Sequence, residues 1–188
     1  METEILDDNN YNDIRNVQYA SFGLRLGATI LDGLITLIPL GLLTYMGYQN
    51  KSLMFLLLSA LLGMLYKPVM EGIWGATLGK MIVNISVVDT DLERIDLGQS
   101  FLKNGIYIIS SVIGMMGHFW LTGTDGFQEA EGALEAMAAG QENPYAMISY
   151  IWGAVILISC FAMLASEFKQ TLHDRLANTY CVHNSTFE

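Results

Sequence analysis

The sequence predicts an all-α membrane protein, a four-transmembrane-helix bundle with both termini cytoplasmic and a short strand or hairpin in a cytoplasmic connection. Of the 188 residues, 52% are hydrophobic and only 15% are charged, whereas soluble domains carry about 25% charged residues. The apolar residues also gather in long runs, and about 20 of them in a helix match a hydrocarbon core of about 30 Å. The net charge of −10 argues against a nucleic-acid partner, which would require a basic face.

The expected spans lie at about residues 22–46, 53–70, 99–121 and 145–168. Ser21 is suited to cap the first helix, because a hydroxyl can accept a hydrogen bond from a free backbone amide. Asp96 followed by Gln99 has the spacing of a capping box at the start of the third. Pro144 is suited to the first turn of the fourth.

The connections between spans carry their own patterns. Val83, Ile85 and Val87 alternate with polar residues and predict a short strand, which residues 89–93 would turn back into a hairpin. The loop 122–143 contains no Lys or Arg and five acidic residues. Within this loop one apolar face recurs at helical spacing and predicts a single amphipathic helix ended at Gly140, its face made of Phe127, Ala130, Leu134 and Met137.

The basic residues predict the orientation. Only Lys51 falls on the side of the acidic loop; the other eight fall at the start of the first span, in the middle connection and after the fourth span, namely Arg15, Arg25, Lys67, Lys80, Arg94, Lys103, Lys169 and Arg175. By the positive-inside rule both termini are cytoplasmic and the acidic loop is outside, and we expect the chain in the cell inner (cytoplasmic) membrane. We expect a mobile acidic tail at 1–18, a transmembrane domain at 19–182 and a C-terminal tail at 183–188.

No enzyme, metal or cofactor is expected from these residues. The two cysteines and three histidines lack metal-ligand spacing, and no Ser-His-Asp set is visible. The stretch GIWGATLGK superficially resembles a phosphate loop, but Met81 stands where that motif requires Ser or Thr. Its glycines instead indicate close backbone packing at the membrane surface.

The first span carries the main candidate site. Arg25 and Asp32 are seven residues apart and project from the same helical face, together with Thr29 and Thr36. A carboxylate inside a membrane costs about 3 kcal/mol or more, so it needs a partner or a wet cavity. One interpretation pairs Arg25 with Asp32 to fix helix packing. The other makes Thr29, Asp32 and Thr36 a cation or proton site.

Two further features are open to a structural interpretation. Gly23 and Gly27 have the spacing that lets another helix approach closely in a membrane. His173 and Asp174, just past the fourth span, are typical of a solvated helix terminus, and adjacent residues on a helix point about 100° apart.

Three segments in order, LRLGATILDGL, GATLGKMIVNISVVD and TLHDRLANTYCV, resemble the RDD family of small bacterial membrane proteins, named for an Arg and two Asp. The resemblance covers roughly residues 19–182 and places those three residues at Arg25, Asp32 and Asp174. The family's glycine box falls on Gly75, Thr77, Leu78, Gly79 and Lys80. Two departures are Ala76, where Gln is usual, and the long acidic loop.

The resemblance implies two alternative functions. The first is a monovalent-cation/proton antiporter exchanging Na⁺, Li⁺ or K⁺ for protons, with the cation or proton at Asp32, Thr29 and Thr36 as neutral ligands, and Asp174 at the cytoplasmic mouth. Four spans are few to enclose a pathway, so this function favours a homo-oligomer. The second is a non-transporting adaptor or regulatory subunit that binds a membrane protein partner, in which the cluster of Arg25, Asp32 and Asp174 is structural.

Overall fold

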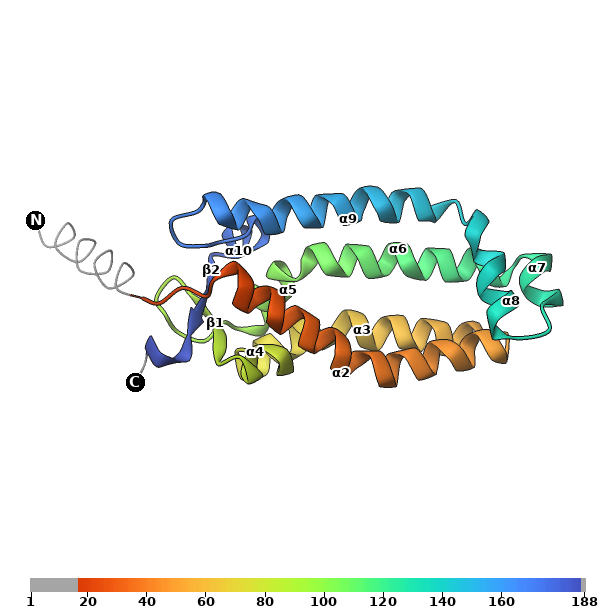
Figure 1. Cartoon of the computed structure of the whole chain (residues 1–188), viewed down its shortest axis with the longest axis horizontal. Helices are drawn as coiled ribbons and strands as arrows, with labels where there is room; N and C mark the ends of the chain where they lie inside the picture. Colours follow the sequence, from red (N-terminus) through yellow and green to blue (C-terminus); the bar gives the residue numbers. More distant parts are fainter. Residues whose placement is uncertain (1–16, 187–188) are drawn as a thin grey trace, which may run out of the picture.

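Four long apolar helices run along the molecule in the computed structural model, which describes residues 17–186 (Figure 1). Each is long and apolar enough to cross a membrane. They are α2 (Phe22–Gln49), α3 (Leu53–Trp74), α6 (Gly105–Thr122) and α9 (Tyr145–Phe161), the last continued by the 3-10 turn η2 (Ala162–Ala165). The prediction of a mostly helical chain with four candidate spans is therefore confirmed. Most of the expected acidic tail, with Arg15, lies outside the described residues.

The spans pack mainly in chain order. α2 contacts α3, α3 contacts α6, and α6 contacts α9, so that α6 lies between α9 and the pair α2–α3 (Figure 1). Every span exposes large apolar side chains, for example Ile38 at 77%, Met54 at 72%, Phe119 at 70% and Ile151 at 61%. Exposed apolar surface of this extent is typical of helices surrounded by lipid rather than water.

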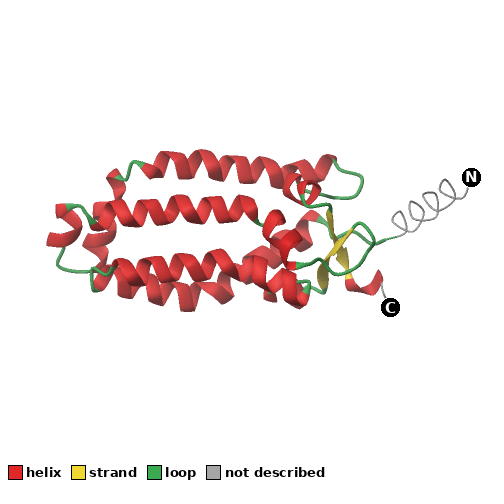
Figure 2. Cartoon of the chain, turned by 180° about the vertical axis from the view of Figure 1, so that it is seen from behind, coloured by secondary structure: helices red, strands yellow, loops and turns green. Residues whose placement is uncertain are grey.

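One end of the molecule, here called the sheet end, holds a two-stranded antiparallel sheet (Figure 2). Strand β1 (Ile85–Asp89) pairs with β2 (Thr179–His183), with Val87 opposite Cys181. The short helices α4 (Leu78–Ile82), α5 (Leu97–Lys103) and α10 (Leu172–Leu176) and the 3-10 turn η3 (Asn184–Thr186) also lie at this end. The Ala20 amide donates to the Cys181 carbonyl over 2.8 Å, so both ends of the described chain meet here.

The predicted strand is confirmed at Ile85 and Val87, whereas Val83 ends α4. The predicted turn at residues 89–93 is present, but the predicted hairpin is wrong because no second strand follows that turn. The partner of β1 comes from the C-terminal segment, and the chain after β1 returns only as an isolated bridge between Val88 and Arg94. Residues 179–182 are all buried. This segment therefore belongs to the core of the sheet end. Its strand runs to His183, one residue beyond the expected end of the transmembrane domain.

The third span begins later than predicted, at Gly105 rather than near Gln99. The capping box of Asp96 and Gln99 is present, but it caps the separate helix α5. Lys103, the last residue of α5, and Asn104, between the two helices, are buried and bonded to a carboxylate of α3. The fourth span ends at residue 161, or 165 with η2, before the predicted residue 168.

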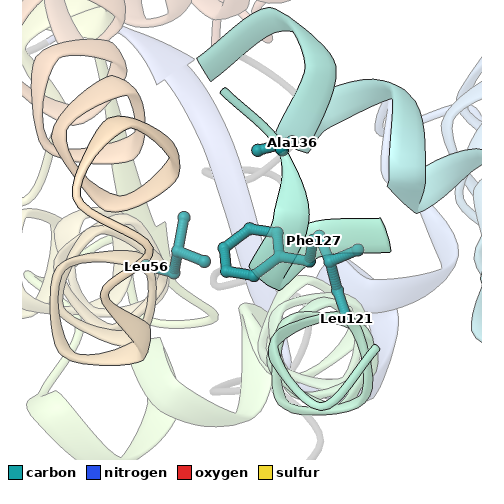
Figure 3. Packing of buried hydrophobic residues seen from close by; sticks show 5 residues of the cluster. Leu56, Leu121, Phe127 and Ala136 are labelled. Carbon is teal, nitrogen blue, oxygen red and sulfur yellow. The ribbon is translucent and has the colours of Figure 1, made fainter. Parts of the chain in front are cut away.

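The opposite end, here called the loop end, contains α7 (Asp125–Glu129), α8 (Ala133–Ala138) and the 3-10 turn η1 (Ala139–Glu142). Figure 3 shows Phe127 packed between Leu56 and Leu121, with Ala136 nearby. The prediction of one continuous helix is wrong: the chain breaks between α7 and α8, which shifts the helical phase. As a result Ala136 is buried, whereas Leu134 is 84% exposed.

Candidate functional site

The Asp32 carboxylate is buried where α2 meets α3 and α4, and three protein groups donate hydrogen bonds to it. Oδ1 accepts from the Tyr66 hydroxyl at 2.8 Å and from the Gly79 amide at 2.7 Å. Oδ2 accepts from the Thr77 hydroxyl at 2.6 Å. Asp32 is only 4% exposed, so these donors replace the water that a carboxylate loses on burial.

The glycine box supplies two of those three donors because of its local backbone. Gly75 adopts φ +73° and ends α3 in the left-handed conformation that favours glycine. Thr77 caps α4, accepting from the Lys80 amide at 3.4 Å while donating to Asp32. A Cβ at Gly79 would overlap the Ala28 carbonyl oxygen, so only glycine lets α4 lie this close to α2.

The structure does not show the predicted close approach of another helix at Gly23 and Gly27. A Cβ built at either position has no other atom within 4 Å. The close contact that α2 makes at this end is with Gly79, through the backbone of Ala28.

Arg25 is paired with Asp174 rather than with Asp32. Its Nη1 lies 2.5 Å from Asp174 Oδ2, across 149 residues of chain. Asp174 is completely buried, and its Oδ2 also accepts from the Thr171 amide at 3.0 Å within a capping box. Burial alone would raise the pKa of the Asp174 carboxyl, but the charges of Arg25 and Lys103 outweigh it and hold that pKa below its usual range. The structure thus buries a residue that its sequence position suggested was solvated.

A second buried carboxylate, Glu71 of α3, was missed by the sequence analysis. Its Oε1 lies 2.5 Å from Lys80 Nζ, and its Oε2 accepts from Lys103 Nζ at 3.0 Å and from Asn104 Nδ2 at 3.1 Å. Lys103 Nζ is also 3.6 Å from Asp174 Oδ1 and so joins the two carboxylates. The sequence signal for this site was a Glu directly after the apolar run of the second span. Because that span was predicted to end at residue 70, Glu71 was assigned to the connection that follows it.

The two threonines of the predicted cation site bond to their own helix. Thr29 Oγ1 donates to the Arg25 carbonyl at 2.9 Å, and Thr36 Oγ1 donates to the Asp32 carbonyl at 2.7 Å. Within the described chain, the groups that the structure brings to the Asp32 carboxylate come from α3 and the glycine box.

His173 links α10 to the spans. Its Nδ1 lies 2.9 Å from Ser159 Oγ, and its ring meets the edge of Tyr107 at a centroid distance of 5.6 Å. Burial lowers the pKa of His173 to about 4, with Asp174 opposing and Lys103 reinforcing the shift. His173 is therefore neutral near pH 7. No group of three His, Cys, Asp or Glu that could hold a metal is found among residues 17–186.

Comparison with known proteins comes from two matches. The family model described as "RDD family" matches residues 19–178. The chain is also similar to the uncharacterized protein YckC of Bacillus subtilis (strain 168), with 29% identity over 87% of this chain and 84% of that protein. No solved structure matches the chain.

Proposed function

The chain belongs to the RDD family, and from this premise we propose that it is a non-transporting adaptor or regulatory subunit of a membrane complex. In this proposal Arg25, Asp32 and Asp174 hold the sheet end onto the spans. The observation that carries it is the Asp32 carboxylate, which already accepts hydrogen bonds from Tyr66, Thr77 and Gly79. Such a set of donors supports a residue that fixes one helix against another.

The surroundings of Asp32 support the same proposal. A bound monovalent cation needs several oxygen atoms around it, but the hydroxyls of Thr29 and Thr36 are hydrogen-bonded to carbonyls of their own helix rather than to the Asp32 carboxylate. Lys80, which is paired with Glu71, directly follows Gly79 in the chain, so its ammonium adds positive charge near Asp32 and disfavours the entry of a cation. A cation entering here would also have to displace the Gly79 amide, which can only donate.

The proposal places the protein in the cytoplasmic membrane with both termini and the sheet end in the cytoplasm. Positively charged residues at the sheet end support this orientation, including Lys80, Arg94, Lys103 and Arg175. At the loop end Lys51 donates to the Gln128 carbonyl, in a region otherwise rich in acidic residues.

A cation/proton antiporter is the second candidate, and one observation favours it. The hydroxyls of Tyr66 and Thr77 contact Asp32, and hydroxyl oxygens can also serve as neutral ligands of Na⁺, Li⁺ or K⁺. In that case Tyr66 and Thr77 would take the role expected of Thr29 and Thr36. Because the spans pack mainly in chain order, a pathway would need a second copy, so this candidate is a homo-oligomer.

Reconstitution decides between the two. Purified protein in liposomes is tested for proton flux driven by Na⁺, Li⁺ or K⁺ gradients, next to empty liposomes and liposomes with a cation/proton-exchanging ionophore. The adaptor proposal expects flux equal to that of empty liposomes. Cation-driven flux in the wild type that Asp32→Asn abolishes at normal membrane abundance would overturn it and establish the antiporter.

A further inference from the structure

The sheet end gathers four basic side chains from four helices around a small number of carboxylates. This cation cluster consists of Arg25, Lys67, Lys80 and Lys103. Glu71 and Asp174 are the carboxylates that form ion pairs with it. The nearby Asp32 is occupied by two hydroxyls and an amide. Among residues 17–186, four basic side chains therefore face two paired carboxylates and the nearby Asp32, so positive charge is in excess in a region with little water to stabilise it.

Two members of the cation cluster retain unused donors. Arg25 uses Nη1 for Asp174, but its Nε and Nη2 are buried and have no hydrogen-bond partner within the described part of the chain. Lys67 Nζ lies 4.3 Å from the centre of the Tyr107 ring, and among the described residues no carboxylate comes within ion-pair distance of it. The two free nitrogens of Arg25 are buried, and buried charged donors without partners are costly, so a bound group that accepts from them would be stabilising. Lys67 is half-buried and adds a second ammonium without a carboxylate partner among residues 17–186.

The free donors of Arg25 have a geometry that selects the ligand. Nε and Nη2 form one edge of the planar guanidinium, and two parallel N–H groups match two oxygens of a phosphate. Asp174 occupies the other nitrogen, so a phosphate on this edge leaves the Arg25–Asp174 pair intact. The side chains of Arg25 and Lys80 keep 14% and 15% of their surface exposed, so the cluster lies near the edge of the fold, although Arg25 Nε and Nη2 themselves are enclosed.

The position of the cation cluster along the spans also indicates which kind of ligand it binds. Arg25 lies in the first turn of α2, Lys67 about two turns from the end of α3, and Lys103 just before α6. If the spans cross a bilayer, these turns lie near its interface, where lipid phosphates are found. Basic pockets between transmembrane helices at this level bind anionic headgroups.

We propose that the cation cluster binds a phosphate-bearing anion, supplied in the membrane by the headgroup of an anionic phospholipid. The Nε–Nη2 edge of Arg25 and the ammonium of Lys67 donate to the phosphate oxygens. Lys80 and Lys103 contribute positive charge while they hold Glu71. The site is independent of whether the protein moves ions.

The test measures binding to the purified full-length protein in a neutral detergent. Phosphatidylglycerol, phosphatidylcholine or inorganic phosphate is titrated while the melting temperature is followed, and native mass spectrometry counts bound lipid. Lys67→Gln removes a charge that has no carboxylate partner among residues 17–186, and Lys169→Gln removes a matched charge from an exposed position at the same end. Arg25→Lys keeps the charge beside Asp174 but loses the two-donor edge.

Phosphatidylglycerol is expected to stabilise the wild type and Lys169→Gln equally. Lys67→Gln and Arg25→Lys should each need at least about tenfold more phosphatidylglycerol for the same stabilisation, as expected for loss of a charge-assisted contact. Stabilisation by inorganic phosphate in place of lipid, with the same dependence on Lys67, would support the phosphate chemistry and assign it to a free anion. Equal stabilisation by phosphatidylcholine, or a Lys67→Gln variant that titrates like the wild type, would overturn the proposal.

Discussion

Asp32 accepts a hydrogen bond from the backbone amide of Gly79, 2.7 Å away, although 47 residues separate them along the chain. Gly79 lies in the first turn of α4, where backbone amides have no partner within their own helix. The carboxylate of the first span therefore satisfies the start of α4, while Thr77 caps the same helix. This relationship explains why an acidic residue in a membrane span and a glycine box after the next span occur in one protein.

Gly79→Ala is expected to destabilise the protein by about 2 kcal/mol or more, because overpacking a close contact typically costs 1–3 kcal/mol. The new Cβ would meet the Ala28 carbonyl oxygen and would lie 2.9 Å from Asp32 Cγ. Membrane abundance and melting temperature measure the loss. Gly27→Ala is the matched control, since its Cβ meets no atom within 4 Å and alanine favours a helix. Equal damage from both substitutions would show that the contact at Gly79 is unimportant.

Double-mutant cycles should show that Arg25 is coupled to the carboxylate of Asp174 rather than to that of Asp32. Arg25→Gln and Asp174→Asn should be strongly non-additive, with a coupling of about 1–3 kcal/mol, because each removes the partner of the other. Arg25→Gln and Asp32→Asn should be closer to additive, because the hydrogen bonds of Asp32 go to other residues. Melting temperatures of the singles and doubles give both couplings. Rescue of Asp32→Asn by Arg25→Gln would mean that these two side chains pair after all.

His173 should make stability depend on pH below neutrality. Its pKa is lowered to about 4 in the folded protein, against about 6.5 in an unfolded chain. Between these two pH values the unfolded state therefore binds more protons than the folded state. The contribution of the neutral His173 ring to the free energy of unfolding is complete above pH 6.5 and is lost as the pH falls towards 4. Between pH 7.5 and 5 the expected loss is about 2 kcal/mol.

The measurement is the melting temperature of wild type and His173→Gln across that range. Asp174 has a lowered pKa and stays ionised throughout, so it should not contribute. Glutamine has no proton to gain, and the variant should lose less stability on acidification. A variant as acid-sensitive as the wild type would assign the effect to other groups.

Cysteine labelling should establish the orientation. Gln128 at the loop end and Asp91 after β1 are both exposed. With a membrane-impermeant maleimide on intact cells, Gln128→Cys should react, and Asp91→Cys should react only after permeabilisation. The unsubstituted protein, with Cys160 half-buried and Cys181 buried, measures background labelling. Labelling of Asp91→Cys alone from outside would invert the proposed topology.

Several features could be predicted from the sequence because they depend on neighbouring residues. A membrane span is an uninterrupted apolar run, so the four candidate helices were found within a few residues, except at the start of α6. The caps at Ser21 and at Asp96 with Gln99 need only residues three positions apart. The strand over Ile85–Asp89 followed from alternation. Each of these is a local property of the chain.

The partners of the buried charges were decided by the tertiary structure. Sequence spacing put Arg25 and Asp32 on one helical face, but side chains on one face can each turn to a different neighbour. Packing placed Asp174 beside Arg25 from 149 residues away and brought Lys80 and Lys103 to Glu71. It also paired β1 with β2 in place of a local hairpin. A buried charge binds whatever opposite charge packing brings within reach, and separation along the chain does not determine that distance.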